Sequence, residues 1–201
     1  FNNSVYNTTD VGIVVNGFNN TIQNNNACNN TNYGFYLTSG STNNNITSNI
    51  ACNNSQHGFY IEVSSNNNFY DNIAYNNSGS GFYLYWDEYS QGSDNNTFVN
   101  NSAYFNEGNG FYVLYSLNNT FVDNNVYNNS YGLYIKLSAF NNISDNTVYN
   151  NANSNIYLTN TNHSTINNNN CSFSALEPSI YLSSCTNVSL TSNLAYNSNS
   201  K

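Results

Sequence analysis

The residues that could carry chemistry are few, and three aspartates stand out because they recur at one position of similar segments. Asp71, Asp123 and Asp145 each follow an apolar residue by two places. Carboxylates gathered in this way could bind calcium or form a catalytic pair. Other copies hold Asn24 or Ser48 there, so a merely polar column is the competing interpretation. Asp123 and Asp145, one repeat apart, are the only calcium candidates, and no other metal or cofactor is expected.

The basic residues give little support to catalysis. Acids that cleave polysaccharides often work together with arginine or lysine, whereas this chain has no arginine and only Lys136 and Lys201 as basic residues. His57 and His163 occupy unrelated positions in their repeats, which argues against a shared metal site or proton relay and predicts surface imidazoles. We therefore expect no enzymatic activity.

The charge balance excludes two kinds of partner. The formal net charge is −8 at pH 7. Nucleic-acid binding depends on Lys and Arg contacts to phosphate, and docking on anionic membranes needs similar cations. No apolar run approaches the ~18 residues of a membrane-spanning helix. The chain has no methionine, even at position 1, which predicts a processed or excised product.

The elements that must position these residues come from an internal repeat. Position zero of the repeat is apolar, and its copies lie 22 to 29 residues apart at Ile22, Ile46, Phe69, Phe98, Phe121, Ile143, Ile166 and Leu190. Three places later the residue is always asparagine, at Asn25, Asn49, Asn72, Asn101, Asn124, Asn146, Asn169 and Asn193, and Asn3 fits a further copy whose position zero would lie just before Phe1. Five places after zero the residue is small or β-branched, as at Ala27. About twelve places after zero comes a segment resembling Gly34–Leu37.

Each copy therefore supplies three short apolar stretches separated by Asn, Gly and Ser turns. Apolar residues and tyrosine alternate in the Gly-Phe-Tyr-Leu stretch, which is typical of a strand, and no copy has the longer spacing of a helix. These features predict an all-β fold, a single right-handed parallel β-helix over residues 1–201 with about nine coils of ~23 residues. Phe35, Leu37, Ile22 and Ala27 should point inward and Tyr36 outward. Stacked asparagines should bond along the axis.

The Asn-Asn-Thr-Ile-x-Asn-Asn and Gly-[Phe/Leu/Ile]-Tyr-[Leu/Ile/Val] motifs resemble the parallel β-helix repeat family across essentially the whole chain. That family includes pectate-lyase-like folds and the copper-maturation protein NosD. The Asn- and Tyr-rich variety looks most like cell-envelope, surface-layer or sheath proteins of methanogenic archaea. The resemblance is specific for fold and weak for function, because the family spans lyases, adhesins and envelope proteins.

Tyrosine columns provide the candidate interaction surface. One outward column consists of Tyr36, Tyr60, Tyr83, Tyr112, Tyr134, Tyr157 and Tyr181. A second consists of Tyr6, Tyr75, Tyr104, Tyr127, Tyr149 and Tyr196. Such aromatic area could stack on carbohydrate or pack against another subunit, and the rings also shield one another. An insertion at residues 85–95 contains Trp86, the only tryptophan, and is either a second contact point or a tolerated surface bulge.

Four cysteines fit an oxidising exterior. Cys28 and Cys52 share one repeat position in successive copies, and stacking would bring their Cα atoms ~5 Å apart, within disulfide range. Cys171 belongs to the inward column and Cys185 to a turn, so their pairing stays open. Several Asn-x-Ser/Thr sequons are glycosylation candidates, namely Asn29, Asn53, Asn76, Asn118, Asn128 and Asn142.

These observations predict a non-catalytic structural protein, extracellular or at the cell surface, that assembles with copies of itself into an envelope layer, sheath or filament. Repeats that begin and end without a cap expose strand edges suited to end-to-end stacking, to a covering partner or to continuation in a longer protein. The alternative is a carbohydrate-binding or polysaccharide-cleaving β-helix protein. Glycans are therefore the second expected partner.

Overall fold

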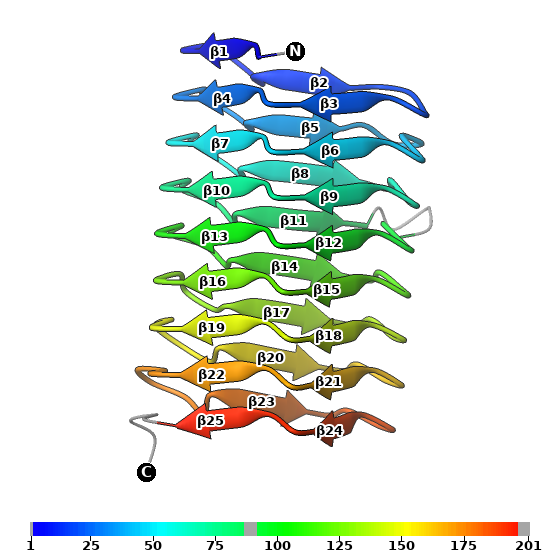
Figure 1. The fold of residues 1–201 in the computed structure, drawn as a ribbon, viewed down its shortest axis with the longest axis vertical. Coiled ribbons are helices and arrows are strands. Elements are labelled where there is room, and N and C mark those ends of the chain that lie inside the picture. The colour runs from blue at the N-terminus through cyan, green and yellow to red at the C-terminus, as the bar shows by residue number, and fades with distance from the viewer. Residues whose placement is uncertain (1, 87–91, 197–201) are drawn as a thin grey trace.

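The computed structural model describes residues 2–86 and 92–196 and shows a solenoid of parallel strands (Figure 1). Each turn adds one short strand to each of three sheets, so neighbours within a sheet are three strands apart in sequence. The chain makes eight complete turns followed by β25, which confirms the expected solenoid with a slight difference from nine coils. The described ranges contain no helix, and hence none that could cross a membrane.

Sheet A has nine strands and carries the small-residue column on its inner side. Val5, Ala27 and Ala51 are aligned directly through the strand pairs. The strands in order are β1 (Ser4–Tyr6), β4 (Asn26–Cys28), β7 (Ile50–Cys52), β10 (Ile73–Tyr75), β13 (Ser102–Tyr104), β16 (Asn125–Tyr127), β19 (Thr147–Tyr149), β22 (Asn170–Ser172) and β25 (Leu194–Tyr196).

Sheet B has eight strands and contains the Gly-Phe-Tyr-Leu segments. Phe35, Phe59 and Phe82 are in register on its inner side. The strands in order are β2 (Ile13–Val15), β5 (Phe35–Leu37), β8 (Phe59–Glu62), β11 (Phe82–Tyr85), β14 (Phe111–Leu114), β17 (Leu133–Lys136), β20 (Ile156–Thr159) and β23 (Ile180–Ser183).

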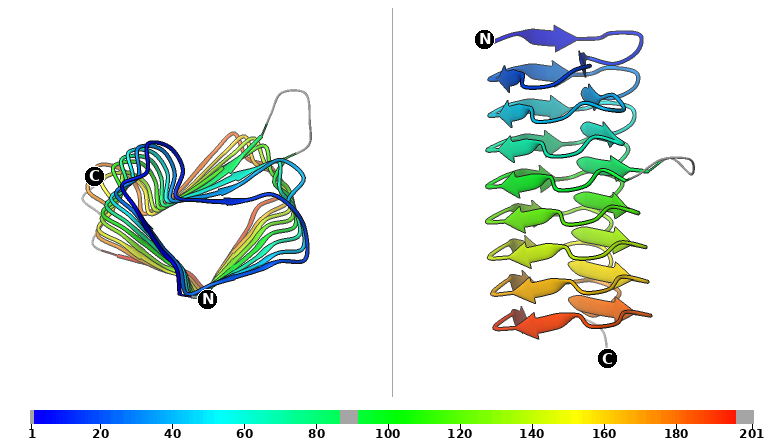
Figure 2. Two further views of the ribbon diagram at one scale, coloured as in Figure 1. Left: turned by 90° about the horizontal axis from the view of Figure 1, so that it is seen from above. Right: turned by 90° about the vertical axis from the view of Figure 1, so that its right-hand side faces the viewer.

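Sheet C has eight strands and carries the residues at position zero of the repeat. The strands in order are β3 (Thr21–Gln23), β6 (Asn45–Thr47), β9 (Asn68–Tyr70), β12 (Thr97–Val99), β15 (Thr120–Val122), β18 (Asn142–Ser144), β21 (Thr165–Asn167) and β24 (Ser189–Thr191). Seen along the axis, the coils superimpose and the three sheets form the sides of one column (Figure 2).

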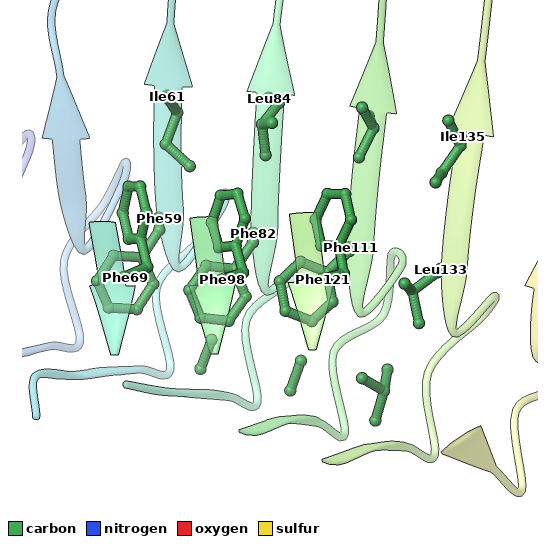
Figure 3. Packing of buried hydrophobic residues seen from close by; sticks show 14 of the residues in the cluster. Phe59, Ile61, Phe69, Phe82, Leu84, Phe98, Phe111, Phe121, Leu133 and Ile135 are labelled. Atoms are coloured by element: carbon green, nitrogen blue, oxygen red, sulfur yellow. The ribbon is translucent and has the colours of Figure 1, made fainter. Parts of the chain in front are cut away.

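The core fills the interior with columns of like side chains. Phe35, Phe59, Phe82 and Phe111 stack along sheet B with ring centroids 4.6–4.7 Å apart. Phenylalanines of sheet C, including Phe69, meet them edge to face (Figure 3). Each such ring pair adds about 1 kcal/mol beyond area burial. The inward positions of Phe35, Leu37 and Ala27 are confirmed, since all three are fully buried, while Ile22 packs at the edge of the cluster.

Glycine precedes six of the eight sheet B strands, and it is required there by the closeness of the next coil. A Cβ atom on Gly58 would lie 2.7 Å from the carbonyl oxygen of Gly81 and 3.0 Å from the Cβ of Ala74. The same crowding keeps the sheet A column small. The pattern of glycine and alanine in the sequence is thus a consequence of one tight corner.

Three asparagine ladders, rather than the single one predicted, satisfy most buried polar groups at the corners, the side-chain nitrogen of Asn119 being an exception among the described residues. The predicted ladder runs through Asn49 and Asn72, whose amide nitrogen and side-chain oxygen are 3.0 Å apart. A second contains Asn20, Asn44, Asn67, Asn96, Asn119 and Asn141, and a third contains Asn30, Asn54, Asn77, Asn106, Asn129 and Asn151. At each corner these side-chain amides supply hydrogen bonds to buried groups of the neighbouring coils.

Candidate functional site

The tyrosine column of sheet B forms an ordered aromatic surface, which we call the tyrosine face: Tyr36, Tyr60, Tyr83, Tyr112, Tyr134, Tyr157 and Tyr181. From Tyr83 to Tyr181 the rings are stacked, with centroids 4.8, 5.2, 5.0 and 5.0 Å apart. Neighbours cover the ring faces, so most of these tyrosines are half-buried. The outward orientation is confirmed, but the surface offers ring edges and hydroxyls instead of flat faces for sugar stacking.

The stack loses its regularity at the end nearest β5 and β8. Tyr60 is tilted by 53° against Tyr83 and by 40° against Tyr36. Tyr33 and His57 lie in this irregular region, with Tyr33 4.4 Å from the ring of Tyr60. A compact aromatic cluster therefore interrupts an otherwise repetitive surface.

His57 is part of this cluster, where the predicted surface imidazole is half-buried between tyrosine rings. Its ring stacks on Tyr33 at 5.7 Å and meets Tyr83 edge-on at 4.6 Å. The backbone N–H of Ser80 donates to Nδ1 over 2.9 Å. Burial lowers the pKa of His57 to about 4, so the ring is neutral near pH 7 and carries its proton on Nε2. His163, by contrast, is exposed and stacks on Phe140 in another corner.

Glu62 brings a carboxylate to the same cluster. It follows Tyr60 by two places on β8 and so projects from the same side of the sheet. The hydroxyl of Tyr36 donates to Glu62. Burial, followed by this hydrogen bond, raises the pKa of Tyr36 to about 12, and burial also raises the pKa of Tyr60. The site therefore offers neutral phenols, one neutral imidazole and one carboxylate, which can bind hydroxyl groups or move a proton.

The comparisons with known proteins identify the fold family. The sequence matches the family described as "Right handed beta helix region" over residues 1–90 and 88–201, which together span the chain. The chain belongs to the right-handed β-helix family. This match confirms the resemblance seen in the sequence motifs and the predicted hand of the solenoid.

Solved structures show the same β-helix in proteins of different kinds. The chain is similar to the A-module of mannuronan C-5 epimerase AlgE6 from Azotobacter vinelandii, with 18% identity and a TM-score of 0.76, over 89% of this chain and 58% of that one. It is similar to the periplasmic alginate epimerase AlgG, with 19% identity and a TM-score of 0.73, over 93% and 50%.

A third similar structure is tailspike protein 2 from an Escherichia coli bacteriophage, with 12% identity and a TM-score of 0.57, over 81% of this chain and 21% of that one. The chain thus spans 58% of one epimerase and 50% of the other, and identities this low show a shared fold alone. No curated protein matches it in sequence.

These similarities correct the expectation that the protein is not an enzyme. That expectation followed from the lack of arginine and from the scattered acids. The same coil, however, occurs in proteins named as epimerases, so the β-helix is compatible with catalysis. The aromatic cluster with His57 and Glu62 supplies titratable groups that the search for regular acid columns did not find.

The aspartate column of this β-helix occupies turn positions. Asp71, Asp123 and Asp145 have φ angles of 58°, 55° and 60°, in the left-handed region that asparagine and aspartate tolerate best. The carboxylate of Asp145 accepts a hydrogen bond from the Asn168 amide over 2.6 Å. Among the described residues there is no group of three or more potential metal ligands.

The second tyrosine column belongs to sheet A and is interrupted. Tyr75, Tyr104, Tyr127 and Tyr149 stack with centroids 4.9–5.2 Å apart. Tyr6 and Tyr196 lie at the two ends of this sheet, and both are exposed. Cysteine and serine replace tyrosine in the remaining copies.

The cysteines follow the column prediction. Cys28 and Cys52 form a disulfide between β4 and β7, with Cα atoms 4.5 Å apart. Cys171 is a buried free thiol whose pKa burial raises to about 12, and Cys185 is free and half-buried. A disulfide of this kind is typical of proteins outside the cytoplasm.

The other candidate residues are spread over the surface. Trp86, at the start of the insertion, packs against Tyr115 with ring centroids 4.2 Å apart, while residues 87–91 of that insertion lie outside the described residues. The sequon asparagines Asn29, Asn53, Asn76 and Asn118 are exposed, and Asn128 and Asn142 are half-buried. All of them except Asn142, which is on β18, have left-handed turn angles.

Proposed function

We propose that this chain binds an extended polysaccharide along the tyrosine face, in an extracellular or cell-surface location. One observation carries the proposal. Tyr112, Tyr134, Tyr157 and Tyr181 repeat at 5.0–5.2 Å along a straight column. Tyrosine combines an apolar ring with a hydrogen-bonding hydroxyl and is common at binding surfaces.

An extended chain of pyranose rings advances by nearly the same distance per sugar as the β-helix advances per coil, roughly 4.8 Å. Consecutive sugars could thus meet the same phenol environment in consecutive coils. Further support comes from the epimerases that share the fold, which are named for the polysaccharides mannuronan and alginate. The disulfide between Cys28 and Cys52 supports a location outside the cytoplasm.

The test removes the hydroxyls while keeping the rings. Tyr112, Tyr134 and Tyr157 are changed together to phenylalanine, and affinity electrophoresis is run against a panel of neutral and acidic polysaccharides. We expect binding to fall by about tenfold or more, because each lost hydrogen bond contributes about 1 kcal/mol. The matched control changes Tyr104, Tyr127 and Tyr149 of sheet A to phenylalanine and should bind normally.

Failure of the unchanged protein to bind any polysaccharide in the panel would contradict the proposal. So would an equal loss in the sheet A variant. Circular dichroism and thermal unfolding of both variants check that the coil is intact, which is expected because phenylalanine preserves the stacking.

The bound polysaccharide is also a candidate substrate, since proton-transfer groups lie at the irregular end of the face. His57 and Glu62 contact tyrosines of that face directly. NMR spectra of the polysaccharide after incubation would reveal a new end group or an inverted centre. A His57→Gln variant should then bind normally and convert nothing. Conversion that is unchanged by His57→Gln would exclude this role.

Self-assembly, expected from the sequence, is a second proposal favoured by one specific observation. Phe105, Phe140 and Phe173 occupy left-handed turn positions with φ angles of 53° to 57°, and their side chains are 49–54% exposed. Asparagine holds such positions in most coils, so these rings cost backbone energy at the surface without entering the core. A second copy could bury them.

Sedimentation velocity over a range of concentrations tests this second proposal. Asparagine is well suited to the left-handed turn geometry. Replacing the three phenylalanines by asparagine should therefore convert associated species to monomers. A chain that sediments as a monomer at every concentration would contradict assembly. Association that persists in the variant would exclude these corners as the contact.

A further inference from the structure

Carboxylates gather along the tyrosine face. Glu62 accepts a hydrogen bond from Tyr36 in the irregular cluster. Asp10, in the turn before β2, accepts a hydrogen bond from the side-chain amide of Asn32, the residue before Tyr33, over 3.1 Å. Glu177, in the turn before β23, accepts a hydrogen bond from the Ser154 hydroxyl over 2.9 Å, and burial, followed by the charge of Glu177, raises the pKa of Tyr131.

Cations are almost absent from the same surface. The sequence has no arginine and only two lysines, of which Lys201 lies outside the described residues. Lys136 is on β17, in register with Leu114 and Thr159, three strands along sheet B from Glu62. His57 is buried among the tyrosines with its Nδ1 atom already accepting a hydrogen bond, which leaves it neutral. Negative charge is thus spread along the face and is opposed there by one lysine.

From this distribution we infer that the tyrosine face takes an uncharged polysaccharide and rejects polyuronates. The inference rests on the proposed function and names its ligand class. A polyuronate brings one carboxylate per sugar, so an extended chain would place several of them beside Glu62, Glu177 and Asp10. Like charges held together at an interface repel each other, and this repulsion grows with each sugar bound. The ligand class therefore differs from the alginate for which the similar epimerase is named.

Uncharged sugars suit every group on the face. Half-buried phenols stay protonated and can donate to sugar oxygens, while the free lone pairs of Glu62 and Glu177 can accept from sugar hydroxyls. A calcium bridge could join a uronate to these acids instead. The described residues hold no cluster of three or more metal ligands that would build such a bridge into the protein.

The experiment compares polymers that differ mainly in charge. A 1,4-linked mannan is paired with polymannuronate, and fully methyl-esterified polygalacturonate with polygalacturonate. Each is titrated onto the intact protein at low and high sodium chloride, with EDTA and then with calcium. We expect at least one neutral polymer to bind about tenfold or more tightly than its acidic partner at low salt, with the gap narrowing as salt screens the repulsion.

Two variants locate the effect. Glu62→Gln removes one carboxylate from the face and should reduce the difference in affinity between the neutral and the acidic polymer. Asp123→Asn removes one carboxylate from a turn that lies away from the face and should leave the gap unchanged. Equal narrowing in both variants would overturn the assignment to the face.

The outcomes separate this inference from the proposed function. The opposite outcome is a protein that prefers a polyuronate and loses that binding when Tyr112, Tyr134 and Tyr157 are changed to phenylalanine. This result would support the tyrosine face as the binding site and overturn the inference. Polyuronate binding that appears only with calcium would overturn it as well. Absence of binding by all four polymers contradicts the proposed function for these ligands and removes the basis of the inference.

Discussion

The side-chain amide of Asn101 donates a hydrogen bond to the side-chain oxygen of Asn124, 3.1 Å away in the next coil. The same amide also donates to the backbone carbonyl of Phe69 over 3.0 Å. In turn, the Asn101 oxygen accepts from the backbone N–H and the side-chain amide of Asn72. One buried side chain thus connects three coils, and a shorter polar residue could not make all these bonds.

Replacing Asn101 by alanine should lower the free energy of unfolding by about 3 kcal/mol or more, because several buried groups lose their partner at once. Urea unfolding followed by circular dichroism measures this. Asn125→Ala is the matched control, since Asn125 is half-buried on the outer side of β16, and it should change stability by no more than about 0.5 kcal/mol. Similar losses in both variants would contradict the ladder as a source of stability.

Loss of the Cys28–Cys52 disulfide should destabilise the coils that it joins. The two cysteines are 24 residues apart, and a closed loop of that length is worth about 3 kcal/mol in the chain-entropy account. Mass mapping without reductant should recover the linked peptide, and Cys28→Ser with Cys52→Ser should unfold at lower temperature. Cys171→Ser is the comparison for a thiol outside the disulfide. Recovery of both thiols in free form would show that the pair is not bridged.

The columns of the sequence were sufficient to predict the fold, because stacking repeats each side chain at one height per coil. The repeat spacing alone predicted that Phe35 and Leu37 point inward and that the ladder through Asn49 is bonded along the axis. The same spacing would have revealed the Asn44 and Asn54 ladders, since both positions are asparagine in six copies.

The candidate site was harder to predict because it consists of exceptions to the repeat. His57 and Tyr33 precede the glycine of successive sheet B segments, and Glu62 follows Tyr60 by two places. Strand alternation alone would have placed Glu62 beside the tyrosines. The tilt of Tyr60 and the burial of His57 depend on how unlike neighbours pack between coils, which no column pattern specifies.

Some turns contain residues poorly suited to their backbone, and replacing one should raise stability. Val63 has a φ angle of 44°, although β-branched residues avoid the left-handed region. Val63→Asn should increase the free energy of unfolding by about 1 kcal/mol, the approximate cost of that conformation for a residue with a Cβ. The reverse change, Asn76→Val at a φ angle of 54°, should decrease it by a similar amount. If the unfolding temperatures of both variants shifted in the same direction, this explanation would be wrong.

His57 should make the stability of the coil depend on pH. Burial lowers its pKa from 6.5 to about 4 in the folded chain, whereas the unfolded chain regains the ordinary value. Between these two values the unfolded state binds the extra proton, so the folded state loses stability as the pH falls. The contribution of neutral His57 to the free energy of unfolding is fully present above about pH 6.5 and is lost by about pH 4. It amounts to at most about 3 kcal/mol.

Urea unfolding at several pH values between 7 and 4 measures the effect, and His57→Gln isolates it. Glutamine does not titrate, and its oxygen can still accept from the Ser80 N–H that now meets Nδ1. The carboxylates give both proteins the same pH dependence of stability. The difference between the two curves of unfolding free energy against pH is therefore due to His57. Relative to the variant, the protein with His57 should lose stability steadily from pH 7 to pH 4. Parallel curves would mean that the imidazole is not shielded by Tyr33 and Tyr83, and that a charged histidine is accepted in the aromatic cluster.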